Sequence, residues 1–235
     1  MKHSNQNDWM SSIKEKFKEF PNLYYGLVDL ISPVYPDKKY KKLLNSLSEN
    51  SEVINLGSGA RKLSQSVINV DISPYENVNV VADIFALPFP DNSIDGIINI
   101  TVLEHISNPN TAVNEIYRVL KPNGLVFSVV PFTLGYHASP HDYTRWTRSG
   151  VEELFSDFDI IEIGITGGPT SSFLWIFQEW LATLLSFNIP FLYRFLLLLF
   201  MLLTFPLKFL DFILNRYESA TNIASNFYFF GKKRI

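Results

Sequence analysis

Cysteine is absent from the 235 residues of the chain, and charged residues are scarce. Without cysteine the protein forms neither disulfides nor thiolate metal sites, and it has no cysteine nucleophile. Asp, Glu, Lys and Arg make up 18% of the residues, below the usual share of about 25%. The net charge of −3 gives no reason to expect nucleic acid as a partner. The first eight residues are polar, so we expect no secretory signal and a cytoplasmic protein.

Apolar residues are abundant instead, at 47% of the chain, and much of the excess falls in one late segment. Elsewhere short apolar runs alternate with helical patterns, which predicts an α/β fold with a doubly wound sheet. The predicted strands cover residues 53–56, 67–70, 78–82, 95–100, 125–130, 158–165 and 226–230. The predicted organisation is a helical lead-in over 1–50, an α/β domain over 51–170 and 221–235, and an apolar helical insertion over 171–220.

In the lead-in, apolar residues recur at helical spacing. The predicted helices are one that carries Trp9, Ile13, Phe17 and Phe20, a short one over 24–31, and a third that opens over 38–42. Lysines cluster near residues 14–18 and 38–42. These two basic patches are either solvated helix faces or contacts to anionic lipid.

The strand over 53–56 runs directly into a glycine-rich turn, Gly57-Ser58-Gly59, where the backbone can approach a ligand closely. Open α/β sheets bind ligands outside the carboxyl ends of such strands. The next strand begins at Val67, so the connection is shorter than the roughly dozen residues of a normal parallel crossover. It leaves room over 61–66 for one or two helical turns at most. Asp71 ends that next strand, where its carboxylate either binds both hydroxyls of a ribose or caps a turn.

The insertion is rich in Phe, Trp and Leu, and residues 195–203 are all apolar. Charged residues interrupt it before any run reaches the ~18 residues of a confident membrane span. Pro190 and Pro206 are expected to break its helices. Over 173–186, apolar and polar side chains fall on opposite helix faces, as in a helix at a membrane interface. Because both ends of the insertion join one sheet, we expect a peripheral or monotopic hairpin on the inner face of the membrane. A homodimer interface or a lid is the alternative.

Several motifs occur in a fixed order along the chain. They are Gly57-Ser58-Gly59, Asp71 at a strand end, Ala82-Asp83 before Leu87-Pro88-Phe89, Asp95 at a strand start, Val102-Leu103-Glu104-His105, and residues 118–124. Together they resemble the class I S-adenosylmethionine-dependent methyltransferases of the type-11 group, over residues 50–165 and the last strand. The resemblance implies a Rossmann-like sheet of seven strands with helices on both faces, and S-adenosylmethionine as cofactor. A rival nicotinamide site lacks its third glycine, which is Lys62 here.

The resemblance also implies cofactor contacts. The methionine and ribose side of the cofactor would be lined by Asn55, Gly57, Ser58 and Gly59. Asp71 would bind the ribose hydroxyls, the adenine would be flanked by Ile72 and Ile84, and Asp83 would accept from the adenine amino group. The sulfonium would lie near Asn99, Ile100 and Thr101. Two positions depart from the family pattern. Asn55 stands where the family has an acid, and Arg61 stands where it has a third glycine.

Glu104-His105 is similar to the motif of metal-dependent relatives, the small-RNA and ubiquinone-pathway O-methyltransferases, which carry two glutamates before the histidine. The first of these is Thr101 here, so we expect no metal. His105 is instead a candidate catalytic base, or it caps the loop after its strand.

The loop over 136–146 places histidines, an acid, an arginine and aromatic residues over the same end of the sheet. We expect His141 and Asp142 to be catalytic, as a base and its orienting partner. We expect His137, Tyr143 and Arg145 to bind the substrate. A purely structural loop is the alternative. Similar loops, followed by an apolar segment, occur in methyltransferase-like proteins of bacterial surface-glycan clusters.

The sequence therefore predicts methyl transfer to a small-molecule, sugar or lipid-linked glycan acceptor at the membrane surface. Because the leaving group is a neutral thioether, positioning of the nucleophile and one base suffice. The alternative is a methyltransferase-like protein that binds without catalysis, as a membrane-anchored partner in a biosynthetic complex.

Overall fold

The structure, a computed structural model, describes residue 26 and residues 29–35 and 37–235. The helix predicted over 9–20 lies outside these residues, as does the first lysine patch. The short helix predicted over 24–31 is described only in part, and its residues 29–31 are helical. The third predicted helix is present as α3 (Lys41–Asn45).

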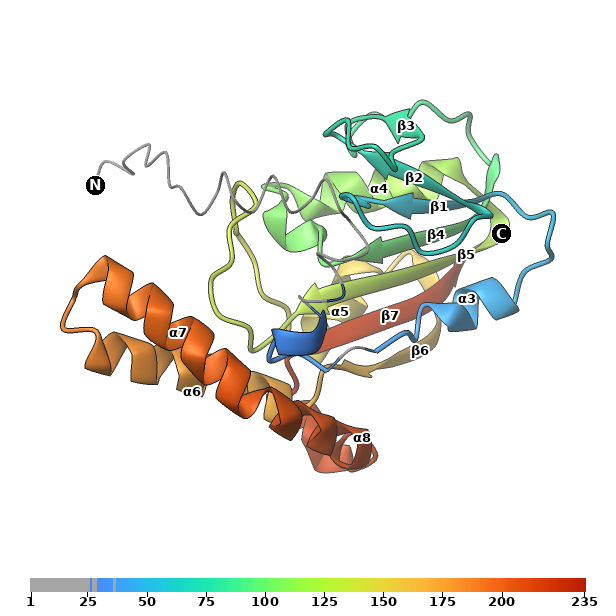
Figure 1. Cartoon of the computed structure of the whole chain (residues 1–235). Coiled ribbons are helices and arrows are strands. Elements are labelled where there is room, and N and C mark those ends of the chain that lie inside the picture. Colours follow the sequence, from blue (N-terminus) through green and yellow to red (C-terminus); the bar gives the residue numbers. More distant parts are fainter. Residues whose placement is uncertain (1–25, 27–28, 36) are drawn as a thin grey trace.

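The described part of the chain forms a seven-stranded sheet in the order β3-β2-β1-β4-β5-β7-β6 (Figure 1). The strands are β1 (Val53–Leu56), β2 (Val67–Asp71), β3 (Val80–Val81), β4 (Ile94–Ile100), β5 (Leu120–Pro131), β6 (Phe158–Thr166) and β7 (Asn226–Lys233). β7 runs antiparallel to both of its neighbours, whereas the pairs from β3 to β5 are parallel. The predicted Rossmann-like seven-stranded fold is confirmed.

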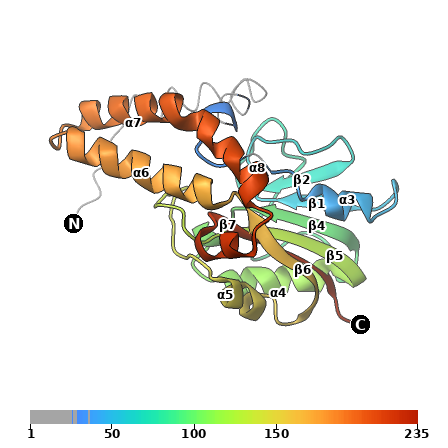
Figure 2. The ribbon, with the colours of Figure 1, turned by 90° about the horizontal axis from the view of Figure 1, so that it is seen from below.

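Helices cover both faces of the sheet because successive strand side chains point to opposite faces. Ile54 and Leu56 pack in one apolar core with α4 (Pro109–Val119) and α5 (Arg148–Leu154). Val53 points the other way, into a second core that includes Leu43 of α3. Figure 2 shows α4 and α5 on one side of the strands and α3 on the other. This frame fixes the strand ends at which the candidate site lies.

β1 and β2 are parallel neighbours that are joined without a helix. The prediction of an unusually short connection is confirmed, but the one or two helical turns allowed over 61–66 are absent. The backbone N–H groups of Gly57 and Ser58 both donate to the carbonyl of Val70, at 2.8 and 3.1 Å. These bonds hold the loop directly against β2, which leaves no length for a crossover helix.

An apolar helical segment connects β6 to β7. It consists of α6 (Pro169–Leu185), α7 (Pro190–Thr204), the 3₁₀ segment η2 (Phe205–Leu210), α8 (Asp211–Leu214) and the 3₁₀ segment η3 (Glu218–Ile223). We call α6 through α8 the hairpin. Pro190 begins α7 as expected, but Pro206 does not end the helical run. It lies at the start of η2, where 3₁₀ bonding accommodates its missing N–H. The continuous run Pro190–Leu214 is long and apolar enough to cross a membrane by length and composition, and 11% of its most apolar stretch is buried.

The hairpin has an inverted polarity: polar side chains lie between its helices and apolar ones face outward. Gln178 is 1% exposed and donates to the hydroxyl of Thr204 at 2.6 Å, and the hydroxyl of Tyr193 donates to Glu179. The outward-facing residues include Phe173, Ile176, Trp180, Leu184, Phe191, Phe195, Leu198, Leu202 and Leu203. A helix pair in water places these two sets the other way round.

Two buried charged side chains lie at the base of the hairpin, where one joins α8 to the start of α6 and the other joins η2 to residues 29–32. The carboxylate of Asp211 accepts hydrogen bonds from the N–H groups of Gly168, Thr170 and Ser171, at 2.8 to 2.9 Å, and from the Ser171 hydroxyl at 2.6 Å. It thereby caps α6, whose first N–H groups have no helical partner. The ammonium of Lys208 donates to the backbone carbonyls of residues 29, 30 and 32, at 2.5 to 2.9 Å, and so closes the end of the short helix there.

We expect Asp211→Asn to lower the free energy of unfolding by about 3 kcal/mol, because an amide cannot accept at both positions and the helix N–H groups are buried. Urea unfolding of the full chain in mild detergent, followed by circular dichroism, measures this change. The matched control is Asp159→Asn, which removes an exposed ion pair to Arg234 and should cost less than about 1 kcal/mol. Equal losses in the two variants would contradict the capping role.

Candidate active site

A cavity of about 620 Å³ opens at the carboxyl ends of β1, β2 and β4. The predicted site residues in its wall are Gly57, Gly59, Asp71, Ile72, Asp83, Ile84, Thr101, His105 and His141. Gly57 and Gly59 adopt left-handed backbone, with φ of 72° and 54°, which glycine accepts without strain. A Cβ on Gly57 would lie 2.3 Å from the Val102 side chain, so the loops after β1 and β4 approach closely only because glycine is present.

Asp71 shapes the floor of this cavity. Its Oδ2 accepts from the N–H of Gly59 at 2.7 Å, and its Oδ1 accepts from the N–H of Ser73 at 2.8 Å. A carboxylate offers about four lone-pair positions, so both oxygens can still accept from ligand hydroxyls. Ile72, which is 69% exposed, and Ile84 place apolar surface beside the carboxylate, where a planar ring can pack.

Asn55, Ser58 and Asn99 do not line this cavity, contrary to the contacts predicted for them. Asn55 is buried within the sheet and donates to Asn69 of β2 at 3.1 Å, and Asn99 donates to a backbone carbonyl of β1 at 3.3 Å. Both asparagines stand on strands covered on both faces, so their side chains enter the layers rather than the open edge. Ile100 lines a second, smaller cavity instead.

Thr101 separates the larger cavity from this smaller one and lines both. Its backbone is left-handed, with φ of 52°, a strained conformation for a β-branched residue that is found mostly at functional sites. The N–H of Thr101 donates to the carbonyl of Val129 at 2.9 Å, which holds the residue against β5. Thr101 is therefore the point at which a group in one cavity meets a group in the other.

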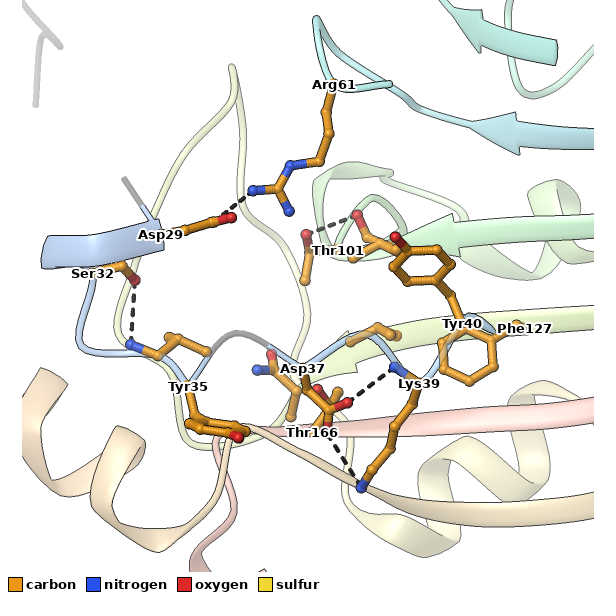
Figure 3. Close-up of a pocket in the computed structure, with 14 residues that line it drawn as sticks. Asp29, Ser32, Tyr35, Asp37, Lys39, Tyr40, Arg61, Thr101, Phe127 and Thr166 are labelled. Carbon is orange, nitrogen blue, oxygen red and sulfur yellow. Dashed lines mark hydrogen bonds and ion pairs between the residues drawn. The ribbon is translucent and has the colours of Figure 1, made fainter. Parts of the chain in front are cut away.

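The smaller cavity, of about 150 Å³, has both polar and apolar groups in its wall (Figure 3). Its labelled residues are Asp29, Ser32, Tyr35, Asp37, Lys39, Tyr40, Arg61, Thr101, Phe127 and Thr166. The guanidinium of Arg61 pairs with Asp29 at 2.5 Å, and the ammonium of Lys39 donates to the carbonyl of Ile165 at 2.6 Å and pairs with Asp37 at 3.3 Å. A cavity of this size holds roughly one ring, and its wall offers hydrogen-bond donors and acceptors.

The predicted pairing of His141 with Asp142 does not form. The Asp142 carboxylate, 1% exposed, accepts from Arg145 at 2.5 and 2.6 Å and from the N–H of His137 at 2.8 Å. The Arg145 guanidinium beside it lowers the pKa of Asp142 to about 2. Arg145 also donates to the carbonyls of Leu134 and Gly135, so this pair clamps the loop after β5. His141 lines the larger cavity, and Tyr143 is exposed.

A cluster of the buried Glu104 and the partly exposed His105 and His137 borders the larger cavity. Glu104 and His105 belong to the 3₁₀ turn η1 (Leu103–His105) after β4, and His137 belongs to the loop after β5. The Nε2 atoms of His105 and His137 lie 3.9 and 3.5 Å from Oε1 of Glu104. The Glu104 carboxylate beside it raises the pKa of His137. Trp175 of α6 packs on His137, with ring centroids 5.9 Å apart, so the hairpin borders this cluster.

Comparison with known proteins relates this chain to methyltransferases. A family model described as a methyltransferase domain matches residues 54–128. The ubiquinone/menaquinone biosynthesis C-methyltransferase UbiE of Rickettsia prowazekii (strain Madrid E) is 32% identical over 123 residues, which are 47% of this chain and 46% of that protein. Over this part of its length the chain is therefore similar to the class I S-adenosylmethionine-dependent methyltransferases. A tRNA (carboxymethyluridine(34)-5-O)-methyltransferase of Arabidopsis thaliana is 27% identical over 59% of this chain and 39% of its own length. The chain thus spans less than half the length of these curated relatives.

Solved structures share the methyltransferase fold at low identity. The 1,6-didemethyltoxoflavin-N1-methyltransferase of Burkholderia thailandensis, solved with S-adenosylhomocysteine, has a TM-score of 0.56 at 12% identity and covers 100% of this chain and 93% of its own. The [4+2]-cyclase SpnF has a TM-score of 0.52 at 16% identity, with coverage of 90% and 81%. One of these proteins is named a methyltransferase and the other a cyclase, so the likeness shows the fold alone.

The larger cavity suits S-adenosylmethionine, the cofactor of the similar methyltransferases. Its volume lies within the roughly 300–1,000 Å³ of small-molecule sites, Gly57 and Gly59 bring backbone close to it, and Asp71 ends β2 at its floor. Sequence reasoning missed the wall of the smaller cavity, because Asp29 and Lys39 lie in the lead-in. It also missed that His137 meets Glu104. Only tertiary folding brings those residues together, and no sequence signal paired them.

Proposed function

We propose that this chain transfers a methyl group from S-adenosylmethionine to a hydroxyl of a sugar or lipid-linked acceptor at the membrane surface. The observation that carries the proposal is the shared position of the hairpin and the candidate site. Asn226, the first residue of β7, pairs with Pro131 at the end of β5 and with Thr166 at the end of β6. The hairpin therefore leaves the sheet at its carboxyl edge (Figure 1). The residues that line the cavities lie at the same edge.

In the proposed assignment, the larger cavity holds the cofactor. Asp71 accepts from the ribose hydroxyls while its backbone bonds keep the two flanking loops in place. Ile72 and Ile84 pack on the adenine, and Asp83 accepts from its amino group. Asp83 is suited to this because its Oδ1 is already fixed by the N–H of Phe85, at 3.0 Å. When bound, the cofactor supplies an electrophilic methyl group on a sulfonium.

The acceptor is assigned to the smaller cavity and the space around Thr101. Hydroxyl groups can bond to the polar side chains in its wall, its apolar groups can pack on a sugar ring, and the room for about one ring suits a single sugar unit. The acceptor oxygen forms a bond to the methyl carbon as the carbon–sulfur bond breaks, and its proton leaves toward His105, which lines the larger cavity. In-line placement of the oxygen carries most of the rate enhancement in such a reaction.

The inverted polarity of the hairpin supports a membrane location. Outward-facing apolar groups are unfavourable in water and favourable in lipid. Polar groups in lipid need hydrogen-bond partners within the protein. The contacts of Gln178 with Thr204 and of Glu179 with Tyr193 meet that requirement. Both ends of the hairpin attach to one sheet edge, so it enters and leaves on the same side. A chain anchored in this way presents its cavities to a lipid-linked acceptor on the inner face.

Isothermal titration of the full chain with S-adenosylmethionine, in detergent or nanodiscs, tests the enzyme against the non-catalytic alternative. We expect saturable binding, followed by appearance of S-adenosylhomocysteine when membrane lipid extract is added. No binding at millimolar cofactor would exclude the enzyme. Binding without turnover on any extract fraction would favour the binding protein. Labelled cofactor then marks the methylated product and so identifies the acceptor.

A further inference from the structure

We infer that Glu104, His105 and His137 form a binding site for a divalent transition metal. Nothing in the sequence pattern alone predicts this site, because Thr101 occupies the position of a possible further acidic ligand. The site depends on His137, which is separated from Glu104 by helix α4, strand β5 and part of a loop, and reaches it only in the folded chain. The nearest ligand atoms of the three side chains all lie within 4.8 Å of one another.

The first support is the state of Glu104. Its side chain is 0% exposed, yet neither carboxylate oxygen has a hydrogen-bond partner among the described residues. A carboxylate that is buried without a partner costs several kcal/mol, so native proteins pair such groups or use them to coordinate metals. The two imidazoles are the groups that face it, at 3.5 and 3.9 Å.

The second support is the orientation of both histidines. Nδ1 of His105 lies 2.6 Å from the carbonyl of His141, and Nδ1 of His137 lies 2.9 Å from the carbonyl of Gly135. A carbonyl only accepts, so each Nδ1 carries the hydrogen. The 3.3 Å contact from Arg145 to Nδ1 of His137 is longer and cannot act as a hydrogen bond at the same time. In neutral rings, both Nε2 lone pairs then point toward Glu104, and a backbone carbonyl behind each ring is the usual outer partner of a metal-bound histidine.

The third support is the spacing of the ligand atoms. Three ligands about 2.1 Å from one metal stand roughly 3.0–3.4 Å apart. The two separations from Glu104, 3.5 and 3.9 Å, need only small side-chain rotations to reach that range. Two imidazoles with one carboxylate select zinc or iron(II) rather than magnesium or calcium, which prefer all-oxygen sites.

The remaining coordination positions of such a metal would be open to solvent or ligand on the side of the larger cavity, because His105 lines that cavity. There the metal would bind the acceptor oxygen and lower the pKa of its hydroxyl. That role rests on the proposed function, and it would replace His105 as the proton acceptor. Metal binding itself does not rest on methyl transfer and can be measured without cofactor or acceptor.

Cobalt(II) provides a direct test, because its visible ligand-field absorption reports protein ligands. The metal-stripped full chain in detergent is titrated with Co²⁺ alone and then with competing Zn²⁺. We expect absorption that saturates at one equivalent and is displaced by zinc. In Glu104→Gln and His137→Gln we expect the affinity to fall by more than the roughly 10–100-fold that loss of an outer partner costs.

His141→Gln is the matched control, since it also removes a histidine next to the cavity. The contact of His141 with His105 is through its backbone carbonyl, which the substitution keeps. This variant should therefore bind Co²⁺ like the unmodified chain. If thermal melting shows that Glu104→Gln does not fold, His137→Gln is compared with His141→Gln alone, because His137 is partly exposed and its substitution disturbs the fold less. No saturable absorption in the unmodified chain, or equal affinity in His137→Gln, would overturn the site. Cofactor titration of the same samples reports separately on the proposed function.

Discussion

Glutamate at both Leu198 and Leu202 will release the full chain from liposomes without unfolding it. Each leucine is 48% exposed on the outward face of α7, so neither substitution disturbs the apolar cores of the sheet. A charged side chain within the apolar part of a bilayer costs about 2.5–3.5 kcal/mol. Two such changes therefore weaken the membrane partition by roughly three orders of magnitude or more. Co-sedimentation with neutral phosphatidylcholine liposomes measures the effect and excludes a simple charge attraction.

The control for this experiment places the same charges elsewhere. Ile160 and Ile161 on β6, the edge strand, are 52% and 50% exposed. Their replacement by glutamate should leave the chain on the liposomes. If the Leu198 and Leu202 variant pellets as fully as the unmodified chain, the hairpin is not the anchor. A hairpin that serves as a dimer interface would instead reveal itself without lipid, as a fall in sedimentation coefficient caused by the same two substitutions.

The second large effect concerns the cofactor. We expect Asp71→Asn to weaken S-adenosylmethionine binding by more than about 100-fold, because hydrogen bonds to a charged group contribute roughly 1.5–3 kcal/mol each. The amide would lose one of the two backbone bonds that position the loops of Gly59 and Ser73, and it would lose an acceptor for the ribose hydroxyls. Isothermal titration measures the affinity directly.

Asp95→Asn is the matched control for Asp71. Asp95 is also a carboxylate in the sheet, but it lies near the amino end of β4, where it accepts from Lys121 at 2.9 Å. Its substitution should leave cofactor affinity unchanged. An Asp71 variant that binds as tightly as the Asp95 variant would mean that the cofactor does not lie across the end of β2.

Local patterns placed the seven strands of the sheet, because apolar runs of four to eight residues between turn residues fit a covered sheet, but they missed that only Val80–Val81 forms β3 and that β5 begins at Leu120. They also placed Gly57, Gly59 and Asp71 at the strand ends. They did not predict that the side chains of Asn55 and Asn99 lie outside the larger cavity. Side chains alternate between the two faces of a strand, so a polar residue near a strand end can point into a buried layer beside the sheet instead of toward the open carboxyl edge. The partner of Asp142 was wrong for a related reason: sequence adjacency to His141 says nothing of loop conformation, and Arg145 reaches the carboxylate instead.

The hairpin shows a different limit of pattern reading. Helical periodicity correctly separated an apolar face from a polar face over 173–186, but periodicity cannot say which face meets a partner helix. The structure buries Gln178 and exposes Trp180. Which face is buried depends on whether water or lipid surrounds the hairpin. The sequence bears on this only through its overall excess of apolar residues.

The contacts of Lys208 give the hairpin a structural role in addition to the membrane contact proposed for it. Removal of the segment would leave the carbonyls of residues 29, 30 and 32 without the ammonium of Lys208. Asp29 also pairs with Arg61, which lies two residues after the last glycine of the turn. A soluble form obtained by truncation would thus be altered at its ligand-binding edge. A soluble form in which charged residues replace the outward-facing apolar residues of the hairpin would keep that edge intact. Solubilisation by surface redesign is therefore the route to crystals of an active form.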